Sequence, residues 1–259
     1  MTARPGRLGV GIVGAGRVGP ILGAALAGAG HAVIGISAIS HASRDRAEAI
    51  LPAVPVLTVP QIVERSELVI LAVPDHELAS LVAGLAATGT WRPGQLVLHT
   101  SARFGTSVLA PALAGGAIPL AIHPAMTFTG TSMDLPRLAA SYFAVTAPTP
   151  VLPIGQALVV EMGGEPVIVA EEDRESYAEA IETATAFSSS IIEQASAILE
   201  RIGVESPGAV IGPLVRSAME DALSRASPDA IDLSLLADLA ETGGAGETPP
   251  VHPTDPENQ

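Results

Sequence analysis

The strongest constraint on this chain is a group of three glycines near its start. In "GIVGAGRVG", residues 11–19, they stand at Gly14, Gly16 and Gly19 with the spacing G-x-G-x-x-G, directly after the apolar run 8–13. A strand followed by such a turn and a helix is typical of dinucleotide binding. Gly14 permits the tight turn, Gly16 lets a pyrophosphate approach backbone N–H groups, and Gly19 lets the helix pack closely on the strand.

Residues beside this turn add donors for an anion. A helix is predicted over 18–29, and its first N–H groups, that of Val18 among them, favour a phosphate. The side chain of Arg17 can reach a phosphate or the adenine. The alternative interpretation is a strand-to-helix turn that binds nothing.

Short apolar segments alternate with helical segments over residues 1–170, which we predict to form one dinucleotide-binding domain. The alternation indicates parallel strands joined by helical crossovers, an α/β fold with a doubly wound parallel sheet of the Rossmann type. The predicted strands are 8–13, 32–37, 68–73, 95–100, 119–123, 142–146 and 166–169.

After residue 170 the strand signals stop. The acidic segment "EEDRE" favours a helix N-terminus, and apolar or small residues then recur at steps of four and three from Tyr177 to Ile202. We predict a smaller all-helical domain over 171–241, whose apolar seam packs in its own core or against a second subunit. Further helices are expected to begin at Ser206 and Ser227, and 242–259 is predicted to be a disordered tail.

Composition excludes several classes of function. A net charge of −14 repels polyanions, so nucleic acid is not an expected partner. The absence of cysteine excludes disulfides, thiolate metal sites and a cysteine nucleophile, and we predict no metal site. No uninterrupted apolar stretch of about 20 residues is present, so no membrane span is expected and a cytoplasmic protein is predicted. Redox chemistry here would require a cofactor.

The second predicted strand bears on which cofactor fits. An acidic residue usually binds a free ribose 2′-hydroxyl at the end of this strand. Here no Asp or Glu lies between Gly30 and Arg44, whereas Ser37, Ser40 and Arg44 can donate to a 2′-phosphate. The sequence therefore favours NADP over NAD, with NAD as the alternative.

Four segments together resemble one family. They are "GIVGAGRVG", "LVILAVPD" at 68–75, "VLHTSA" at 97–102 and "AIHPAMTF" at 121–128. The chain resembles Rossmann-like proteins with a C-terminal DUF2520 domain, which are related to ketopantoate reductases, F420-dependent NADP reductases and enzymes similar to 6-phosphogluconate dehydrogenase. The resemblance implies a Rossmann domain, then an all-helical domain that often forms a homodimer, with the active site in the cleft between domains.

The resemblance also implies site residues at the carboxyl ends of three strands. Residues of "AVPD" would lie beside the ribose and nicotinamide, and those of "HTSA" and "HPAM" would end the next two strands, although the family's glycine after His-Thr-Ser is Ala102 here. The implied cofactor contacts are Ala72, Val73, Pro74, Asp75 and Thr100.

The predicted catalytic residues are His123 as proton donor, Ser101 as substrate anchor and Glu182 as a further donor. For His123 the alternative is a buried histidine bonded to a carbonyl, and His99 is expected to be structural. Related proteins carry two polar residues on the long helix, where this chain has Ala178 and Ala186. Glu182, Thr183 or Thr185 could replace them, and Glu182 lies one helical turn past Ala178.

Two functions remain open from the sequence. The first is an NADP-dependent oxidoreductase that reduces a small carbonyl compound, for example a ketopantoate-like 2-oxo acid, or alternatively an imine. The second is a non-catalytic NADP-binding sensor or assembly protein, which the two alanines favour.

Overall fold

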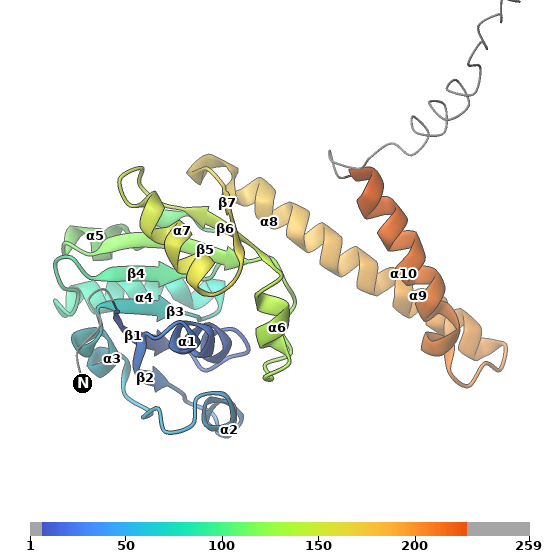
Figure 1. Cartoon of the computed structure of the whole chain (residues 1–259), viewed down its shortest axis with the longest axis horizontal. Coiled ribbons are helices and arrows are strands. Elements are labelled where there is room, and N and C mark those ends of the chain that lie inside the picture. The colour runs from blue at the N-terminus through green and yellow to red at the C-terminus, as the bar shows by residue number, and fades with distance from the viewer. Residues whose placement is uncertain (1–6, 227–259) are drawn as a thin grey trace, which may run out of the picture. The chain divides into compact units, whose positions relative to one another are not determined.

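The computed structural model describes residues 7–226, and these contain a seven-stranded sheet with helices on both faces (Figure 1). The predicted helix at Ser227 and the predicted tail 242–259 lie outside the described residues. All seven predicted strands are present. They are β1 (Gly9–Val13), β2 (Ala32–Ser37), β3 (Leu68–Leu71), β4 (Leu96–His99), β5 (Ile118–Pro124), β6 (Tyr142–Thr146) and β7 (Glu165–Ile168).

The strand order is β2-β1-β3-β4-β5-β6-β7, and every neighbouring pair is parallel except one. This confirms the Rossmann-type α/β fold, with one correction: β6 runs antiparallel to β5, pairing Phe143 with Pro124. The connection 125–141 begins and ends at the carboxyl edge of β5. A connection between parallel strands must return to the opposite edge of the sheet, whereas this connection stays at one edge.

Apolar residues alternate between the two faces of the strands, so each face has its own core. On one face Ile12, Ile70 and Leu98 pack with residues of α1 and α7, and on the other Val13, Val69 and Val97 pack with α3, α4 and α5. The helices around the sheet are α1 (Gly19–Gly28), α2 (His41–Ile50), α3 (Val59–Arg65), α4 (Asp75–Ala87), α5 (Ala110–Ala114), α6 (Asp134–Leu138) and α7 (Leu152–Glu161), with short 3-10 turns η1 (Thr106–Leu109) and η2 (Glu171–Asp173).

The chain divides into two compact units between Phe187 and Ser188, later than the predicted boundary after residue 170. The first unit includes α8 (Arg174–Glu182) and a π-helical turn, η3 (Thr183–Phe187). The boundary lies after α8 because Arg174 attaches the start of this helix to the sheet.

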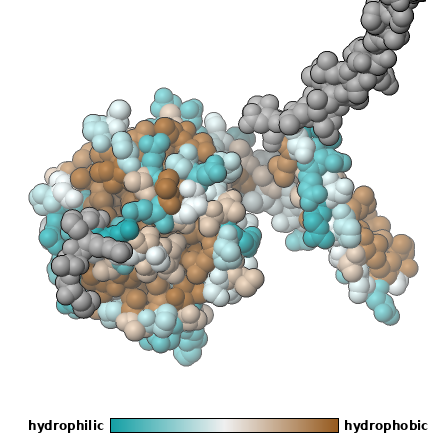
Figure 2. Space-filling model, in the orientation of Figure 1, coloured by the Kyte–Doolittle hydropathy of each residue, from teal (hydrophilic) through white to brown (hydrophobic). Residues whose placement is uncertain are grey.

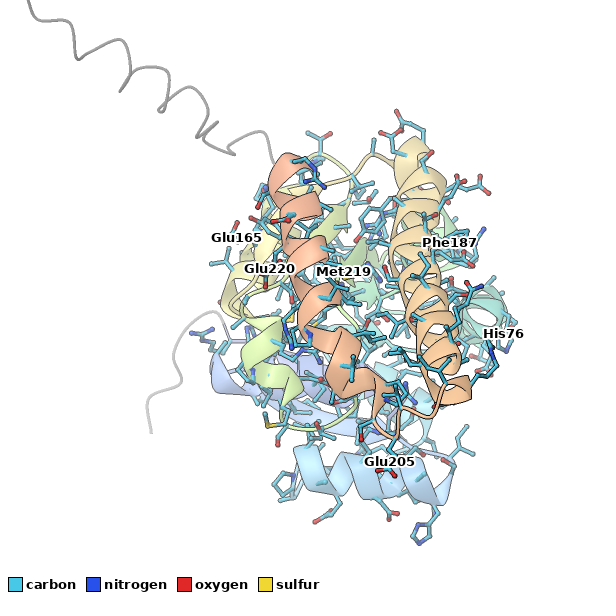
Figure 3. The ribbon with its side chains drawn as sticks, turned by 90° about the vertical axis from the view of Figure 1, so that its right-hand side faces the viewer. His76, Glu165, Phe187, Glu205, Met219 and Glu220 are labelled. Carbon is cyan, nitrogen blue, oxygen red and sulfur yellow. The ribbon has the colours of Figure 1, made fainter. Side chains whose placement is uncertain are left out.

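The second unit consists, within the described residues, of α9 (Ser188–Arg201) and α10 (Pro207–Ala226), which lie side by side (Figure 3). Gly203, at φ +89°, follows α9, as is typical of a helix C-terminus. The predicted start after Ser206 is confirmed, and α10 continues through Pro213 as one helix. No helix among the described residues is long and apolar enough to span a membrane.

Arg174 is 1% exposed, and its guanidinium donates hydrogen bonds to oxygens from three strands or their ends. Nη2 donates to the carbonyls of Ala121 (2.8 Å) and Ala144 (3.1 Å), Nε to Thr146 Oγ1 (2.7 Å) and Nη1 to the Ser101 carbonyl (3.4 Å). Burial lowers the Arg174 pKa to about 10, so the side chain stays charged at neutral pH.

Arg174→Met should destabilise the first unit by about 3 kcal/mol, because buried oxygens lose their charged donor and methionine offers none. Urea unfolding followed by the fluorescence of the single Trp91 measures this, since Trp91 is buried in the first unit. Arg201→Met, at an exposed position of α9, is the matched control. Equal stability of the two variants would contradict the proposed anchoring.

Candidate functional site

The three glycines of the turn serve different purposes. Gly14 has φ +107°, and a Cβ there would meet the Ala72 carbonyl oxygen; a Cβ on Gly19 would meet the Gly14 carbonyl oxygen. A Cβ on Gly16 would meet nothing within 4 Å. Gly14 and Gly19 are thus required by the fold, whereas Gly16 faces open space where a ligand can approach.

Ser37, at the end of β2, holds this turn in place. Its Oγ accepts a hydrogen bond of 2.9 Å from the Gly14 N–H, so its hydroxyl proton stays available to a ligand. Ser40 is the N-cap of α2 and accepts from the Ser43 N–H at 3.1 Å. Both serines line the same pocket as the glycine turn.

Two arginines lie at the turn, and a third lies on the first half of α2. Arg46, on α2, donates from Nη1 to the Ala15 carbonyl at 3.0 Å, and the sequence analysis did not assign it to the site. Arg17 is exposed beside the turn, and Arg44 is exposed on the first half of α2. Val18 is the residue before α1 and is partly buried. Arg17 and Arg46 place positive charge next to the open Gly16.

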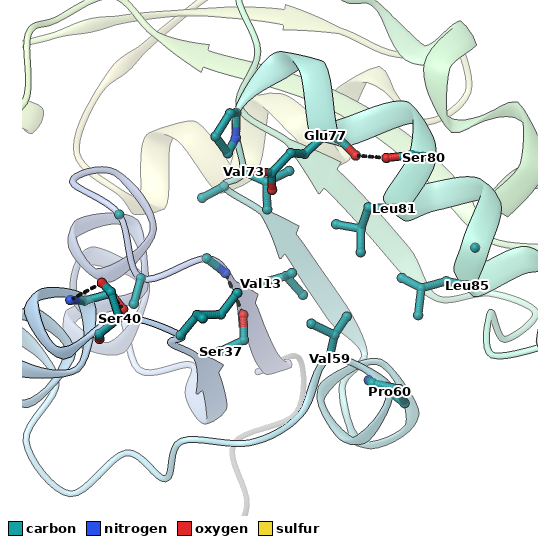
Figure 4. Close-up of a pocket in the computed structure, with 18 of the residues that line it drawn as sticks. Val13, Ser37, Ser40, Val59, Pro60, Val73, Glu77, Ser80, Leu81 and Leu85 are labelled. Carbon is teal, nitrogen blue, oxygen red and sulfur yellow. Dashed lines mark hydrogen bonds between the residues drawn. The ribbon is translucent and has the colours of Figure 1, made fainter.

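A pocket of about 860 Å³ lies against the turn (Figure 4), a volume in the range of cofactor sites. Of the predicted cofactor residues it contains Gly14, Gly16, Ser37, Ser40, Ala72, Val73 and Pro74. Arg17, Val18, Gly19, Arg44, Asp75 and Thr100 do not line it. The far wall, from α3 and α4, was not predicted: Val59, Pro60, Glu77, Ser80, Leu81, Gly84, Leu85 and Thr88.

His99 and Ser101, at the end of β4, make hydrogen bonds that fix a turn. His99 is fully buried, with Nε2 2.8 Å from the Gly105 carbonyl oxygen, which supports the structural role expected for it. Burial lowers the pKa of His99 to about 4, against the opposing effect of that hydrogen bond. Ser101 Oγ accepts from the N–H groups of Arg103 (3.2 Å) and Phe104 (3.3 Å). Both of these hydrogen bonds lie within the turn, so they do not support the predicted role of Ser101 as a substrate anchor.

His123, near the end of β5, is paired with a residue that the sequence analysis missed. Its Nδ1 lies 2.9 Å from the hydroxyl of Tyr177 on α8, and the two rings meet edge to face with centroids 5.6 Å apart. Burial is the main cause of a His123 pKa of about 4; Arg174 acts in the same direction and Asp75 in the opposite one. Burial also raises the pKa of Tyr177. Both side chains are therefore neutral at pH 7.

The remaining predicted residues make no hydrogen bond to this pair within the described part of the chain. Glu182 is exposed, and its Oε2 is 3.9 Å from Arg103 Nη2. Asp75 begins α4 and interacts electrostatically with both His99 and His123. The Thr100 N–H donates to the Leu71 carbonyl at 3.3 Å. Ala178 is buried on α8, where it supplies packing in place of a polar group.

Comparisons with known proteins agree with this architecture. Residues 1–124 match the family model of a Rossmann-like domain, and residues 141–231 match the domain of unknown function DUF2520. The curated proteins include none that matches this sequence.

Several solved structures are similar in fold. A proposed NADP oxidoreductase from Bacteroides fragilis has a TM-score of 0.68 at 17% identity, covering 92% of both chains. A pyrroline-5-carboxylate reductase from Coxiella burnetii has a TM-score of 0.59 at 15% identity, covering 91% of both. An imine reductase from Streptomyces aurantiacus has a TM-score of 0.62 at 15% identity, covering 91% of this chain and 78% of the other. At these identities the likeness establishes the fold alone.

The lowered pKa of His99 predicts a pH-dependent stability. Unfolded histidine binds a proton near pH 6.5 and folded His99 only near pH 4, so stability is complete above about pH 6.5 and falls as the pH decreases toward 4. Between about pH 7.5 and pH 5 this loss is about 2 kcal/mol.

His99→Gln keeps a donor for the Gly105 carbonyl and removes the titrating group. Between about pH 7.5 and pH 5, the free energy of unfolding should decrease in both proteins, and we expect the decrease in His99→Gln to be smaller by about 2 kcal/mol. Urea unfolding at both pH values, followed by Trp91 fluorescence, checks the difference. An equal loss in the two proteins would mean that His99 does not control this pH dependence.

Proposed function

We propose that this chain, which joins a Rossmann-like domain to a DUF2520 domain, is an NADP-dependent oxidoreductase that reduces a small carbonyl compound. The observation that carries the proposal is the open face of Gly16 in a pocket of about 860 Å³ that the turn itself lines. Similarity in fold to solved structures described as reductases adds support for a general oxidoreductase role.

The residues around the turn fit a dinucleotide. Its pyrophosphate would lie against the N–H groups at Gly16 and the start of α1, with Arg17 nearby. When bound, a nicotinamide supplies the hydride that a carbonyl reduction requires. The chain would bind the cofactor, shield it from water and provide the proton.

The preference for NADP over NAD rests on the end of β2. Ser37 offers a hydroxyl proton and Arg44 offers a cation, while the Ser40 hydroxyl in the same pocket donates to Ser43 Oγ. No Asp or Glu lies between Gly30 and Arg44 to repel a 2′-phosphate. Glu77, the acidic residue of the pocket, belongs to the opposite wall on α4. NAD is the alternative cofactor.

The proposed substrate is a small carbonyl compound such as a ketopantoate-like 2-oxo acid, with an imine as the alternative. A non-catalytic NADP sensor or assembly protein is the second candidate function. The feature that favours it is the pair of alanines, Ala178 and Ala186, at positions where the family resemblance implies polar groups. Oxidation of NADPH on addition of 2-oxo acids or a cyclic imine distinguishes the two.

We further propose that the helical unit forms a homodimer. Figure 2 shows hydrophobic residues gathered at the end of the α9–α10 pair where the two helices connect. Ile202 is 73% exposed and Leu214 71% exposed, and exposed apolar side chains that gather in one patch mark a protein–protein contact surface. Sedimentation velocity of the full chain measures the oligomeric state.

Gly16→Asp tests the cofactor site directly. The added side chain has room in the fold but would place a carboxylate in the space for the pyrophosphate, so we expect NADPH affinity to fall at least about 100-fold with unchanged stability. Nicotinamide fluorescence titration measures the affinity. Gly28→Asp, at an exposed glycine near the far end of α1 that is equally open, is the matched control. Retained affinity in Gly16→Asp would overturn the proposed site.

Arg44→Ala tests the choice of cofactor. Loss of a charged donor to the 2′-phosphate should weaken NADPH binding about tenfold or more and change NADH binding less than about twofold. Arg65→Ala, at the exposed end of α3, is the control. Equal effects on both cofactors would show that Arg44 is a surface residue without a role in selectivity.

A further inference from the structure

His123 and Tyr177 form a pair of half-buried polar side chains joined by a hydrogen bond. They come from β5 and α8, and the Nδ1–hydroxyl distance of 2.9 Å is that of a good hydrogen bond. Arg174, one helical turn before Tyr177, places its guanidinium carbon 5.9 Å from the centre of the tyrosine ring. The buried arginine thus fixes α8 so that the hydroxyl meets the imidazole.

The pair lies at the edge of the sheet where the cofactor pocket lies. β1, β3, β4 and β5 are mutually parallel, so Gly14, Pro74 and His123 all follow or end their strands at the same edge. His123 is two strands away from the pocket wall at Ala72–Pro74, about 10 Å at the usual strand spacing. His123 also points to the same face of the sheet as Val13, since Ile122 belongs to the other core.

Both side chains of the pair are neutral at pH 7. Asp75 and Arg174 are the charged groups that act on His123, and their effects oppose each other. His123 Nε2 has no hydrogen-bond partner among the described residues. Since no buried side-chain nitrogen or oxygen of the described residues lacks a partner, Nε2 is open to solvent.

We propose that Tyr177 is the catalytic acid of the reaction and that His123 delivers the proton to it from solvent. This inference rests on the proposed reductase function. As the carbonyl carbon gains a hydride, its oxygen takes the proton of the Tyr177 hydroxyl, and the tyrosine oxygen takes the proton from His123 Nδ1. Nε2 accepts one proton from solvent, so the imidazole changes tautomer while both side chains stay neutral. The net effect of these transfers is the uptake of one proton from solvent, which is the number that a carbonyl reduction consumes.

The other predicted donors are less suited to this step. An imidazolium at His123 is scarce at pH 7 because its pKa is about 4. Ser101 caps a turn, and Glu182 is an exposed carboxylate beside Arg103. Ala178 has no proton to donate, and Tyr177, the residue immediately before it on the same helix, supplies a hydroxyl donor instead.

The first test requires no substrate. The proposal requires that His123 carry its proton on Nδ1, which ¹⁵N NMR of the histidine-labelled full chain at pH 7 detects. Tyr177→Phe should shift this ring toward the Nε2–H tautomer, because the hydroxyl that accepts from Nδ1 is gone. Tyr142→Phe, at the other tyrosine of the chain, is exposed on β6 and should leave the signal unchanged. An Nε2–H tautomer in the wild type would overturn the proposal.

The second test measures turnover with NADPH and a panel of ketopantoate, other 2-oxo acids and a cyclic imine. Tyr177→Phe should lower kcat at least about 100-fold, in the range of a lost general acid, and leave the NADPH Kd within about twofold. Tyr142→Phe should match the wild type. Unchanged turnover in Tyr177→Phe would overturn this inference alone, whereas a wild type that binds no NADPH would overturn the proposed function.

Discussion

The first unit depends on one buried cation. Arg174 has no carboxylate within 4 Å among the described residues; instead, carbonyl oxygens and a threonine hydroxyl surround its guanidinium. A buried charge is costly unless hydrogen bonds satisfy it, and here the acceptors belong to β5, to β6 and to the segment after β4. The same side chain therefore closes the antiparallel part of the sheet, fixes the start of α8 and sets the position of Tyr177.

Much of the fold followed from local patterns in the sequence. Short apolar segments located all seven strands, and Ser206 marked the start of α10. The direction of β6 was not predictable in this way, since the apolar pattern of a strand is the same whichever way it runs. The compact division after Phe187 also depends on a tertiary contact, that of Arg174, and a single arginine among acidic residues gives no such signal.

The residues of the site also divide into those that local patterns predict and those that depend on tertiary contacts. The glycines and Ser37 were predictable because a turn, a strand end and their spacing lie within one crossover unit. The α3–α4 wall, Arg46 and Tyr177 were not, since each reaches the site from a distant segment. Tyr177 in particular fits the apolar periodicity of its helix, and only the position of α8 against β5 distinguishes it from a core residue.

The hydrogen bond between the Gly14 N–H and Ser37 Oγ has a consequence for how such a chain could change over evolution. The amide requires an oxygen acceptor at position 37 but does not distinguish a hydroxyl from a carboxylate. An acidic residue there would still hold the turn while adding a charge that binds a free ribose hydroxyl and repels a phosphate. Selectivity between the two nicotinamide cofactors can thus drift by substitution at one position, while the loop beside it keeps its shape.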